Sequence, residues 1–332
     1  MKNKHVLFIW LLFFVAIAFF ACSGNTANKK NAENEEIADL TSKIKVKPSD
    51  ALLYFSRAEV YHGLHKDSLA ALDYIQAVEL DSTKAKYYSA AANVLFNMKD
   101  VRSITYINKA LQLNPNDITA HLKIATIHFY SKNYPDAFKS INTVLRNDVY
   151  NYDAYFLKGM CYKDMGDTVS ATSSFQTAAR INPENPDPYL QLGLILANTD
   201  EKQAKLYLES AFKADTNNVE PLNAIGLIYQ GKKENAAAKK EFIRCINAKP
   251  GFAKAYYNIG CILIDEDSLP KAQRQFDIAV KHEPQYVEAF FNRGLCKEMQ
   301  KDIAGALQDY EQALLLNPDF KLAIDGKKRL RK

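Results

Sequence analysis

The sequence has few of the residues that build metal and redox sites, and their spacing suits neither. Its 332 residues include five cysteines and six histidines. Beyond Cys22, the cysteines are Cys161, Cys245, Cys261 and Cys296, whose separations fit no zinc or redox pattern. The histidines form no HExxH motif, and the glycines form no phosphate-binding loop. We therefore expect no metal, no cofactor, no small-molecule substrate and no catalytic activity.

A strong charge of one sign is also missing. The formal net charge of +5 falls to +3 when Lys2 and Lys4 are set aside with the N-terminal segment. Such a balance predicts no nucleic-acid partner. Basic residues do gather between Lys327 and Lys332. This run is typical of a solubilising cap, and contact with anionic lipid or cell-wall polymer is the alternative.

The N-terminal apolar run is too short to cross a membrane. It covers residues 6–21, whereas a spanning helix needs about 20 apolar residues. Lysines before it and a small residue at its end are typical of a secretory signal peptide over residues 1–21. "FFAC", ending at Cys22, resembles a bacterial lipobox. The resemblance implies that Cys22 carries the lipid that anchors the mature chain. Cleavage as an ordinary signal peptide near Ala21 is the alternative.

Residues 22–47 read as a polar tether between this anchor and the folded body, with a short helix over 35–46.

The rest of the chain repeats with a step of 33 or 34 residues. One column holds only small residues: Ala58, Ala92, Ala125, Gly159, Gly193, Gly226, Gly260 and Gly294. A second column is bulky: Tyr74, Ile107, Ile141, Phe175, Leu208, Phe242, Phe276 and Tyr310. The second and fifth units are each one residue short, and we place the deletion in the turn between their two helices.

Within each unit the apolar residues follow a helical period. Tyr155, Gly159 and Tyr162 form one stripe, and Ala171, Phe175 and Ala178 form the stripe of a second helix. One helix pair cannot bury its own stripe, so successive pairs must stack. The column of Cys161 and Cys296 is otherwise aliphatic. We therefore expect both thiols to be buried.

This period and these columns resemble the tetratricopeptide repeat family. The resemblance implies an all-α fold, a right-handed superhelical solenoid of about eight helix–turn–helix repeats over residues 48–320. Residues 321–332 would form a basic capping helix. Some members bind a peptide's terminal carboxylate with a clamp of Lys, Asn and Arg on three successive first helices. The matching positions here do not assemble that clamp.

A second stripe on each first helix lines the concave face in this family. From the fourth repeat onward its middle residue is apolar, which predicts a continuous apolar groove. Packing of this stripe on itself or on the tether is the alternative. The predicted groove consists of Phe156, Met160, Leu190, Leu194, Leu227, Tyr257, Cys261, Ile264, Phe291 and Leu295.

Together these features predict a non-catalytic scaffold that binds protein partners through this groove. Its predicted location is the bacterial cell envelope, lipid-anchored at the outer membrane and facing the periplasm. Two alternatives stay open. One is a chaperone-like binder of unfolded or secreted chains, and the other is an accessory regulator of a cell-wall enzyme.

Overall fold

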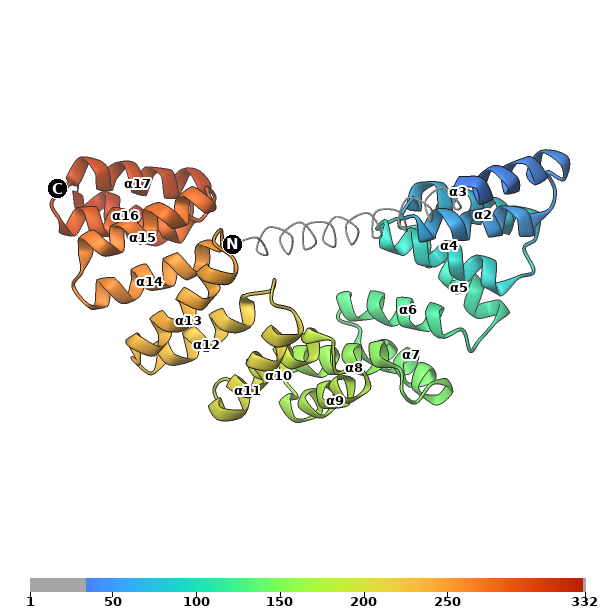
Figure 1. Ribbon diagram of the computed structural model, residues 1–332, viewed down its shortest axis with the longest axis horizontal. Coiled ribbons are helices and arrows are strands. Elements are labelled where there is room, and N and C mark those ends of the chain that lie inside the picture. Colours follow the sequence, from blue (N-terminus) through green and yellow to red (C-terminus); the bar gives the residue numbers. More distant parts are fainter. Residues whose placement is uncertain (1–33, 331–332) are drawn as a thin grey trace, which may run out of the picture. The chain divides into compact units, whose positions relative to one another are not determined.

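The computed structural model describes residues 34–330, and every regular element in that range is a helix (Figure 1). The expected signal peptide, the lipid-bearing Cys22 and residues 22–33 of the tether lie outside the described residues. The first described helix covers residues 34–46, so the short helix predicted for 35–46 is confirmed.

The remaining helices alternate with short turns. Their bounds are α2 Ala51–Gly63, α3 Asp67–Leu80, α4 Ala85–Asn97, α5 Ser103–Leu113, α6 Ile118–Tyr130, α7 Tyr134–Asn147, α8 Tyr152–Asp164, α9 Thr168–Ile181, α10 Pro186–Leu196, α11 Glu201–Ala214, α12 Glu220–Gly231, α13 Asn235–Ala248, α14 Ala253–Asp265, α15 Leu269–His282, α16 Val287–Met299, α17 Ile303–Leu316 and α18 Lys321–Leu330. Helices α2–α17 form the eight predicted pairs, and α18 follows them as a cap.

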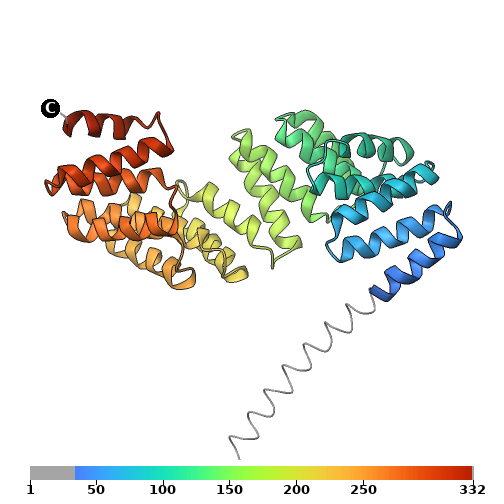
Figure 2. The ribbon, with the colours of Figure 1, turned by 90° about the horizontal axis from the view of Figure 1, so that it is seen from above.

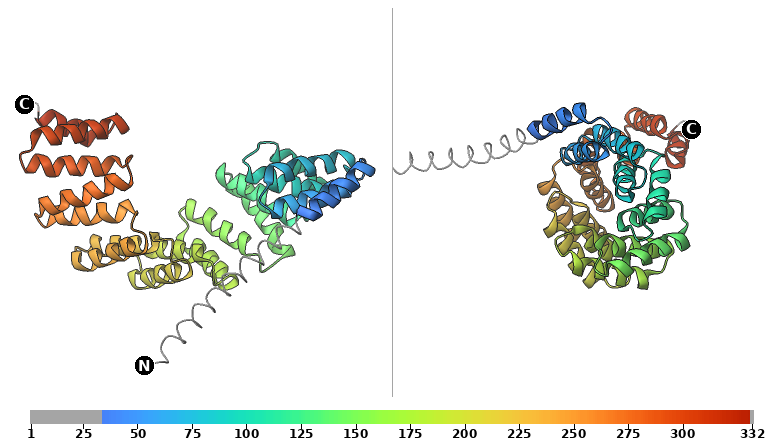
Figure 3. Two further views of the ribbon diagram at one scale, coloured as in Figure 1. Left: turned by 45° about the horizontal axis from the view of Figure 1, so that its top comes forward. Right: turned by 90° about the vertical axis from the view of Figure 1, so that its right-hand side faces the viewer.

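The chain divides into two compact units, one up to Leu157 and one from Lys158 onward. Within the first unit, α2 to α7 contact their neighbours in chain order (Figure 2). Within the second unit, α9 to α18 do the same, and the left view of Figure 3 shows the orange and red helices α14–α18 as neighbouring layers. Each unit is therefore a stack of helix pairs, as a repeat architecture requires.

The two columns of the sequence form the core of each pair. Every bulky residue in the second column is almost fully buried, from Tyr74 to Tyr310. The small column gives these side chains room. A Cβ atom added to Gly260 would lie 2.7 Å from the Phe276 ring, closer than packed carbon atoms approach. Gly260 and Phe276 therefore fit as a matched pair, which explains why small and bulky residues alternate between the two helices.

The turn inside most repeats is a left-handed helix cap. In the sixth repeat, Lys233 has φ 61°. Its N–H donates to the Gln230 carbonyl, and the N–H of Glu234 donates to the Tyr229 carbonyl. This is a Schellman motif, which satisfies carbonyls that the helix end leaves unpaired. The same pair of bonds follows the left-handed residues of six other repeats, which are His65, Lys99, Lys132, Gly166, Asp267 and Lys301.

Single helices cover both ends of the repeat array. Leu40 and Ile44 of the helix over 34–46 are each 8% exposed. Thr41 in the same helix accepts a 2.9 Å hydrogen bond from Arg57 in the first repeat. At the other end, α18 buries Ala323 against the last repeat. Within residues 34–330, no helix combines the length and the apolar character needed to span a bilayer.

Candidate functional site

Most of the predicted groove residues are covered by neighbouring repeats. Leu194 and Leu227 are 43% and 47% exposed, whereas Phe291 is 9% exposed. Phe156 lies in the first unit and is half-buried. The others are half-buried in the second unit, namely Met160, Leu190, Tyr257, Cys261, Ile264 and Leu295. Exposed apolar surface on the stripe is therefore concentrated in the fifth and sixth repeats.

Contacts between successive repeats cover the rest of the stripe. Leu190 packs against a core cluster of the next repeat that contains Leu222. Tyr257 packs against Tyr286, the residue just before α16 of the next repeat, with the ring centroids 4.9 Å apart. Leu295 packs against a cluster that includes Ala323 of the following helix, α18. At these positions the stripe joins neighbouring helix pairs and is not free for a partner.

Leu194 and Leu227 line one pocket, which lies between α10 and α12. Its volume is about 630 Å³, within the range of about 300–1,000 Å³ that ligand-binding pockets occupy. Its lining residues are Leu194, Ala197, Asn198, Thr199, Glu201, Ala224, Leu227, Ile228, Gly231 and Lys232. The aliphatic side chains come from α10 and α12, and the polar residues come from the ends of these helices and the start of α11. The pocket is thus apolar with a polar rim.

The turn after α10 explains why a pocket opens here. The fifth repeat is one residue short, and α10 ends at Leu196, whereas α8 and α14 each run to a thirteenth residue. Asp200 lies seven residues after Gly193, as Lys233 lies seven residues after Gly226 in the sixth repeat. The φ of Asp200 is −142°, however, and its side chain caps α11. The N–H groups of Thr199 and Asp200 both donate to the Leu196 carbonyl. This turn therefore lacks the Schellman motif that the other seven described repeats have. The segment 197–199 therefore forms a turn where the other repeats continue the first helix, and space is left beside this turn.

A second hollow lies on the other side of the same turn. Its volume is about 480 Å³, and α9 and the end of α10 form it. It shares Thr199 with the first pocket, and Val169 in its wall is 80% exposed. The shortened end of α10 is thus less tightly covered on two sides. The second repeat is also one residue short, but α4 keeps 13 residues and Lys99 keeps the left-handed turn. The early end of α10, rather than the missing residue alone, therefore accounts for the opening.

Glu201 and Lys232 line the pocket and form an ion-pair cluster with Lys205, which lies outside the lining. Glu201 accepts from the Lys205 ammonium at 2.7 Å through Oε1, and Oε2 forms an ion pair with Lys232. The bonds from Lys205 and Lys232 lower the pKa of the Glu201 carboxyl below its ordinary value of 4.5. Lys205 also donates to the Tyr229 hydroxyl at 3.3 Å, and its ammonium lies 4.4 Å from the centre of that ring. The carboxylate is therefore ionised and held in place at neutral pH.

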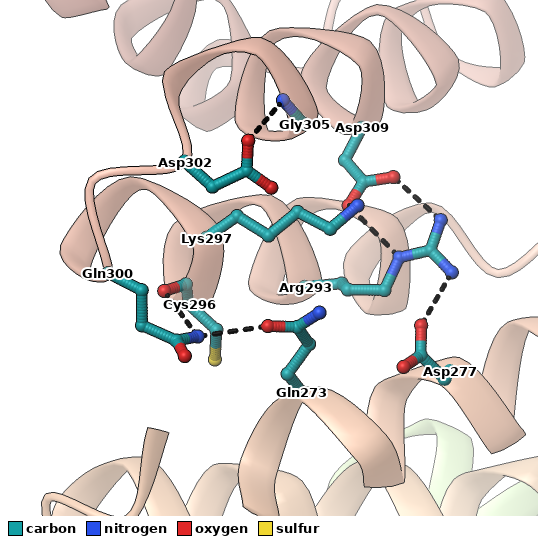
Figure 4. Close-up of polar contacts among 9 residues, drawn as sticks. All are labelled: Gln273, Asp277, Arg293, Cys296, Lys297, Gln300, Asp302, Gly305 and Asp309. Atoms are coloured by element: carbon teal, nitrogen blue, oxygen red, sulfur yellow. Dashed lines mark hydrogen bonds and ion pairs between the residues drawn. The ribbon is translucent and has the colours of Figure 1, made fainter. Parts of the chain in front are cut away.

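A second charged cluster, in the last two repeats, is complete in itself. Figure 4 shows Arg293 reaching both Asp309 and Asp277. Lys297 adds a 2.8 Å ion pair to Asp309, whose side chain is 3% exposed. Burial opposes the charge of Arg293, but its bonds to Asp309 and Asp277 outweigh this and raise its pKa. Two cations balance two carboxylates, so this cluster joins α15, α16 and α17 and offers no unmatched charge to a ligand.

The cysteines behave as core residues. Cys161 and Cys296 are fully buried, which confirms the prediction from their column, and Cys245 is buried as well. All three are free thiols, as is the half-buried Cys261. Burial raises the pKa of Cys161 to about 11 and that of Cys296 to about 12. Across residues 34–330, no three potential metal-binding side chains gather at one place.

The basic C-terminal run is partly neutralised by its own chain. Lys327 pairs with Glu311 at 2.7 Å, and Arg329 pairs with Glu298 at 2.9 Å. These contacts attach α18 to the helices before it. They favour the interpretation of this run as a cap.

The sequence identified the two exposed leucines of the pocket but missed its polar rim. Glu201, Lys205 and Lys232 were not predicted as site residues, because none of them belongs to the stripe. The one-residue deletion in the fifth repeat was visible in the column spacing. That deletion was the available signal, since a shortened turn marks the place where helix packing changes.

Comparison with known proteins agrees with the repeat architecture. Residues 287–320 match one model of the tetratricopeptide repeat, and residues 152–185 and 219–252 match a second one. These segments begin with α8, α12 and α16. The solved C-terminal part of a tetratricopeptide repeat protein from Cytophaga hutchinsonii is 19% identical, with a TM-score of 0.57. That similarity covers 73% of this chain and 99% of the other, and at this identity it shows the fold alone.

Two curated relatives are much longer than this chain. Protein O-mannosyl-transferase TMTC3 of Homo sapiens is 25% identical over 238 residues, which are 70% of this chain and 26% of that protein. Anaphase-promoting complex subunit 3 of Schizosaccharomyces pombe is 27% identical over 184 residues, which are 54% of this chain and 26% of that protein. The chain thus spans about a quarter of the length of either relative. Their activities and assemblies do not transfer to it.

Proposed function

We propose that this chain, which is built from tetratricopeptide repeats, is a non-catalytic scaffold that binds a protein partner in the pocket of its fifth and sixth repeats. The observation that carries the proposal is the joint exposure of Leu194 and Leu227 inside a pocket of about 630 Å³. In the fourth, seventh and eighth repeats the equivalent side chains Met160, Cys261 and Leu295 are half-buried. An opening of this kind between helices takes an apolar side chain of a partner and removes it from water.

Crosslinking tests this proposal directly. A photoreactive phenylalanine analogue replaces Leu227 in the full chain, which is then expressed and irradiated in intact cells. We expect a discrete crosslinked product. Leu206 of α11 is the control position, because it is 56% exposed but does not line the pocket. Equal crosslinking at both positions would contradict a specific site.

A double substitution tests the same pocket by charge. Leu194→Asp with Leu227→Asp places two carboxylates on the apolar wall, so capture of the crosslinked partner should be lost. Circular dichroism and the melting midpoint should stay nearly unchanged, because both side chains are already exposed. Leu206→Asp with Ile243→Asp is the matched control, since these side chains are 56% and 49% exposed. Continued capture by the pocket double mutant would place the binding surface elsewhere.

The proposal includes a location. A signal peptide over residues 1–21 and a lipid on Cys22 would hold the chain at the bacterial envelope, at the outer membrane and facing the periplasm. The support is the sequence pattern around Cys22. Metabolic labelling with an alkynyl fatty acid should tag the protein, and Cys22→Ser should remove both the tag and the membrane association. A Cys22→Ser protein that is still labelled and still membrane-bound would refute the anchor.

A further inference from the structure

The charged groups beside the pocket differ in how many ion pairs and hydrogen bonds they already make within the protein. Both oxygens of Glu201 face lysines, and its side chain is 20% exposed. This one carboxylate neutralises only one of the two ammonium groups, so the cluster of Glu201, Lys205 and Lys232 keeps a net charge of +1. The acidic member of the rim is therefore occupied within the protein.

Lys205 is engaged to a similar degree. Its ammonium group contacts Glu201 and the Tyr229 hydroxyl and lies above the Tyr229 ring. Lys232 differs, because its side chain is 55% exposed and its single ion pair in the described structure is with Glu201. An ammonium group has three N–H donors. Lys232 thus keeps donors directed at solvent beside the apolar wall.

Together, the wall and the rim select the chemistry of an occupant. Leu194, Leu227 and the neighbouring alanines remove an apolar side chain from water. Lys232 offers hydrogen-bond donors next to it, and a net positive charge remains because its partner Glu201 is shared with Lys205. A basic partner would meet an ammonium group there and would be disfavoured.

We propose that the pocket recognises an acidic apolar segment of a protein, in which a large apolar side chain enters the pocket and an Asp or Glu close to it in sequence binds Lys232. This inference rests on the proposed function and adds the partner's chemical class to it. The acidic group is a side chain within the segment, because the rim has one available ammonium group rather than a set of cations arranged around a chain end.

Selection from a random 12-residue peptide library displayed on phage tests this inference. The purified full chain is the target, and the chain carrying Leu194→Asp and Leu227→Asp removes clones that do not need the pocket. We expect the retained clones to carry Leu, Ile, Phe or Trp within four residues of an Asp or Glu. One retained peptide is then synthesised for affinity measurements.

Lys232→Gln should weaken binding of this peptide about two- to fivefold, as loss of a partly exposed ion pair does. The loss should shrink as sodium chloride is raised, because salt screens exposed charges. Lys202→Gln is the matched control, since Lys202 is an exposed lysine of α11 outside the pocket lining. It should leave the affinity unchanged.

Retained clones that are basic or uncharged would overturn the inference, and so would a peptide affinity that ignores Lys232→Gln. Failure to retain any pocket-dependent clone would overturn it as well. None of these results contradicts the proposed function, which is tested separately by crosslinking at position 227. An acidic preference together with equal crosslinking at positions 227 and 206 would instead leave a peptide site without a specific cellular partner.

Discussion

Arg293 and Asp309 form a two-point ion pair between the helices of the last repeat. The guanidinium Nε and Nη2 atoms donate to the two Asp309 oxygens at 3.0 and 2.6 Å. Arg57 and Asp73 of the first repeat are bonded in the same way, at 2.7 and 2.8 Å and with the same separation of 16 residues. The two terminal repeats, which each have a neighbouring repeat on one side only, thus share a polar clamp between their helices.

Loss of this clamp should destabilise the C-terminal end of the chain. Asp309→Ala leaves Arg293 and Lys297 without their shared buried carboxylate, and breaking a buried pair from one side costs about 3–5 kcal/mol. Urea unfolding followed by circular dichroism measures the change. Asp277→Ala is the control, because that side chain is 48% exposed and an exposed pair contributes about 0–1 kcal/mol. Equal effects of the two changes would show that burial of Asp309 is unimportant.

The left-handed turns predict a stabilising substitution. Lys301 has φ 66°, a conformation that costs a non-glycine residue about 1–2 kcal/mol. Lys301→Gly removes this cost, and the greater freedom of glycine in the unfolded chain offsets part of the gain, leaving about 0.5–1 kcal/mol. The melting temperature should rise. The reverse change, Gly166→Lys at the equivalent turn with φ 80°, should lower it, and a fall for both would refute the backbone explanation.

The deletion after α10 can be reversed. Insertion of one glycine between Thr199 and Asp200 supplies the residue that the other turns hold in the left-handed conformation. It should let α10 extend into the pocket, so peptide and partner binding should be lost while the helical circular dichroism signal is kept. Thr199→Gly adds a glycine without adding length, and it should bind as the wild type does. Unchanged binding after the insertion would show that turn length does not set the pocket.

Acid should loosen the C-terminal cap. Hydrogen bonds from Arg329 and Tyr310 hold the pKa of Glu298 below its ordinary 4.5, against the opposing effect of burial. Because the folded-state pKa is the lower one, this contribution to stability is complete above pH 4.5 and is lost as the pH falls through the folded value. Hydrogen exchange of α18 amides, corrected for intrinsic rates, should therefore quicken as the pH falls below 4.5. Glu298→Gln should remove that dependence, and a variant that keeps it would assign the effect to another group.

The buried thiols should tolerate truncation. Cys161 is fully buried, and its replacement by alanine removes one sulfur atom, for which we expect a cost of about 1–2 kcal/mol. The raised pKa of about 11 keeps this thiol protonated at neutral pH, so labelling by iodoacetamide at pH 8 should require unfolding. A non-reducing peptide map that shows Cys161 in a disulfide would contradict both expectations.

The core could be predicted from the sequence because it depends on local spacing. Gly260 and Phe276 lie at fixed places in one helix pair, so their contact follows from the helical period. The exposure of the groove could not be predicted in this way. Leu295 and Leu227 occupy equivalent places on the stripe, yet Leu295 is half-buried and Leu227 is 47% exposed. The difference depends on how closely the next pair approaches, which is set by turn lengths and contacts several residues away.

The shortened turn has a consequence for protein engineering. Site residues in most proteins are acquired by substitution, which changes the chemistry of a surface but leaves its outline. Here the cavity lies where α10 ends early at a shortened turn, and the leucines that line it already belong to the ordinary repeat pattern. Removal of one residue from the equivalent turn of another helix pair, such as Asp265–Ser268, should open a hollow beside Cys261 and Leu295. Binding positions along such an array can therefore be moved by deletion, without redesign of the helices themselves.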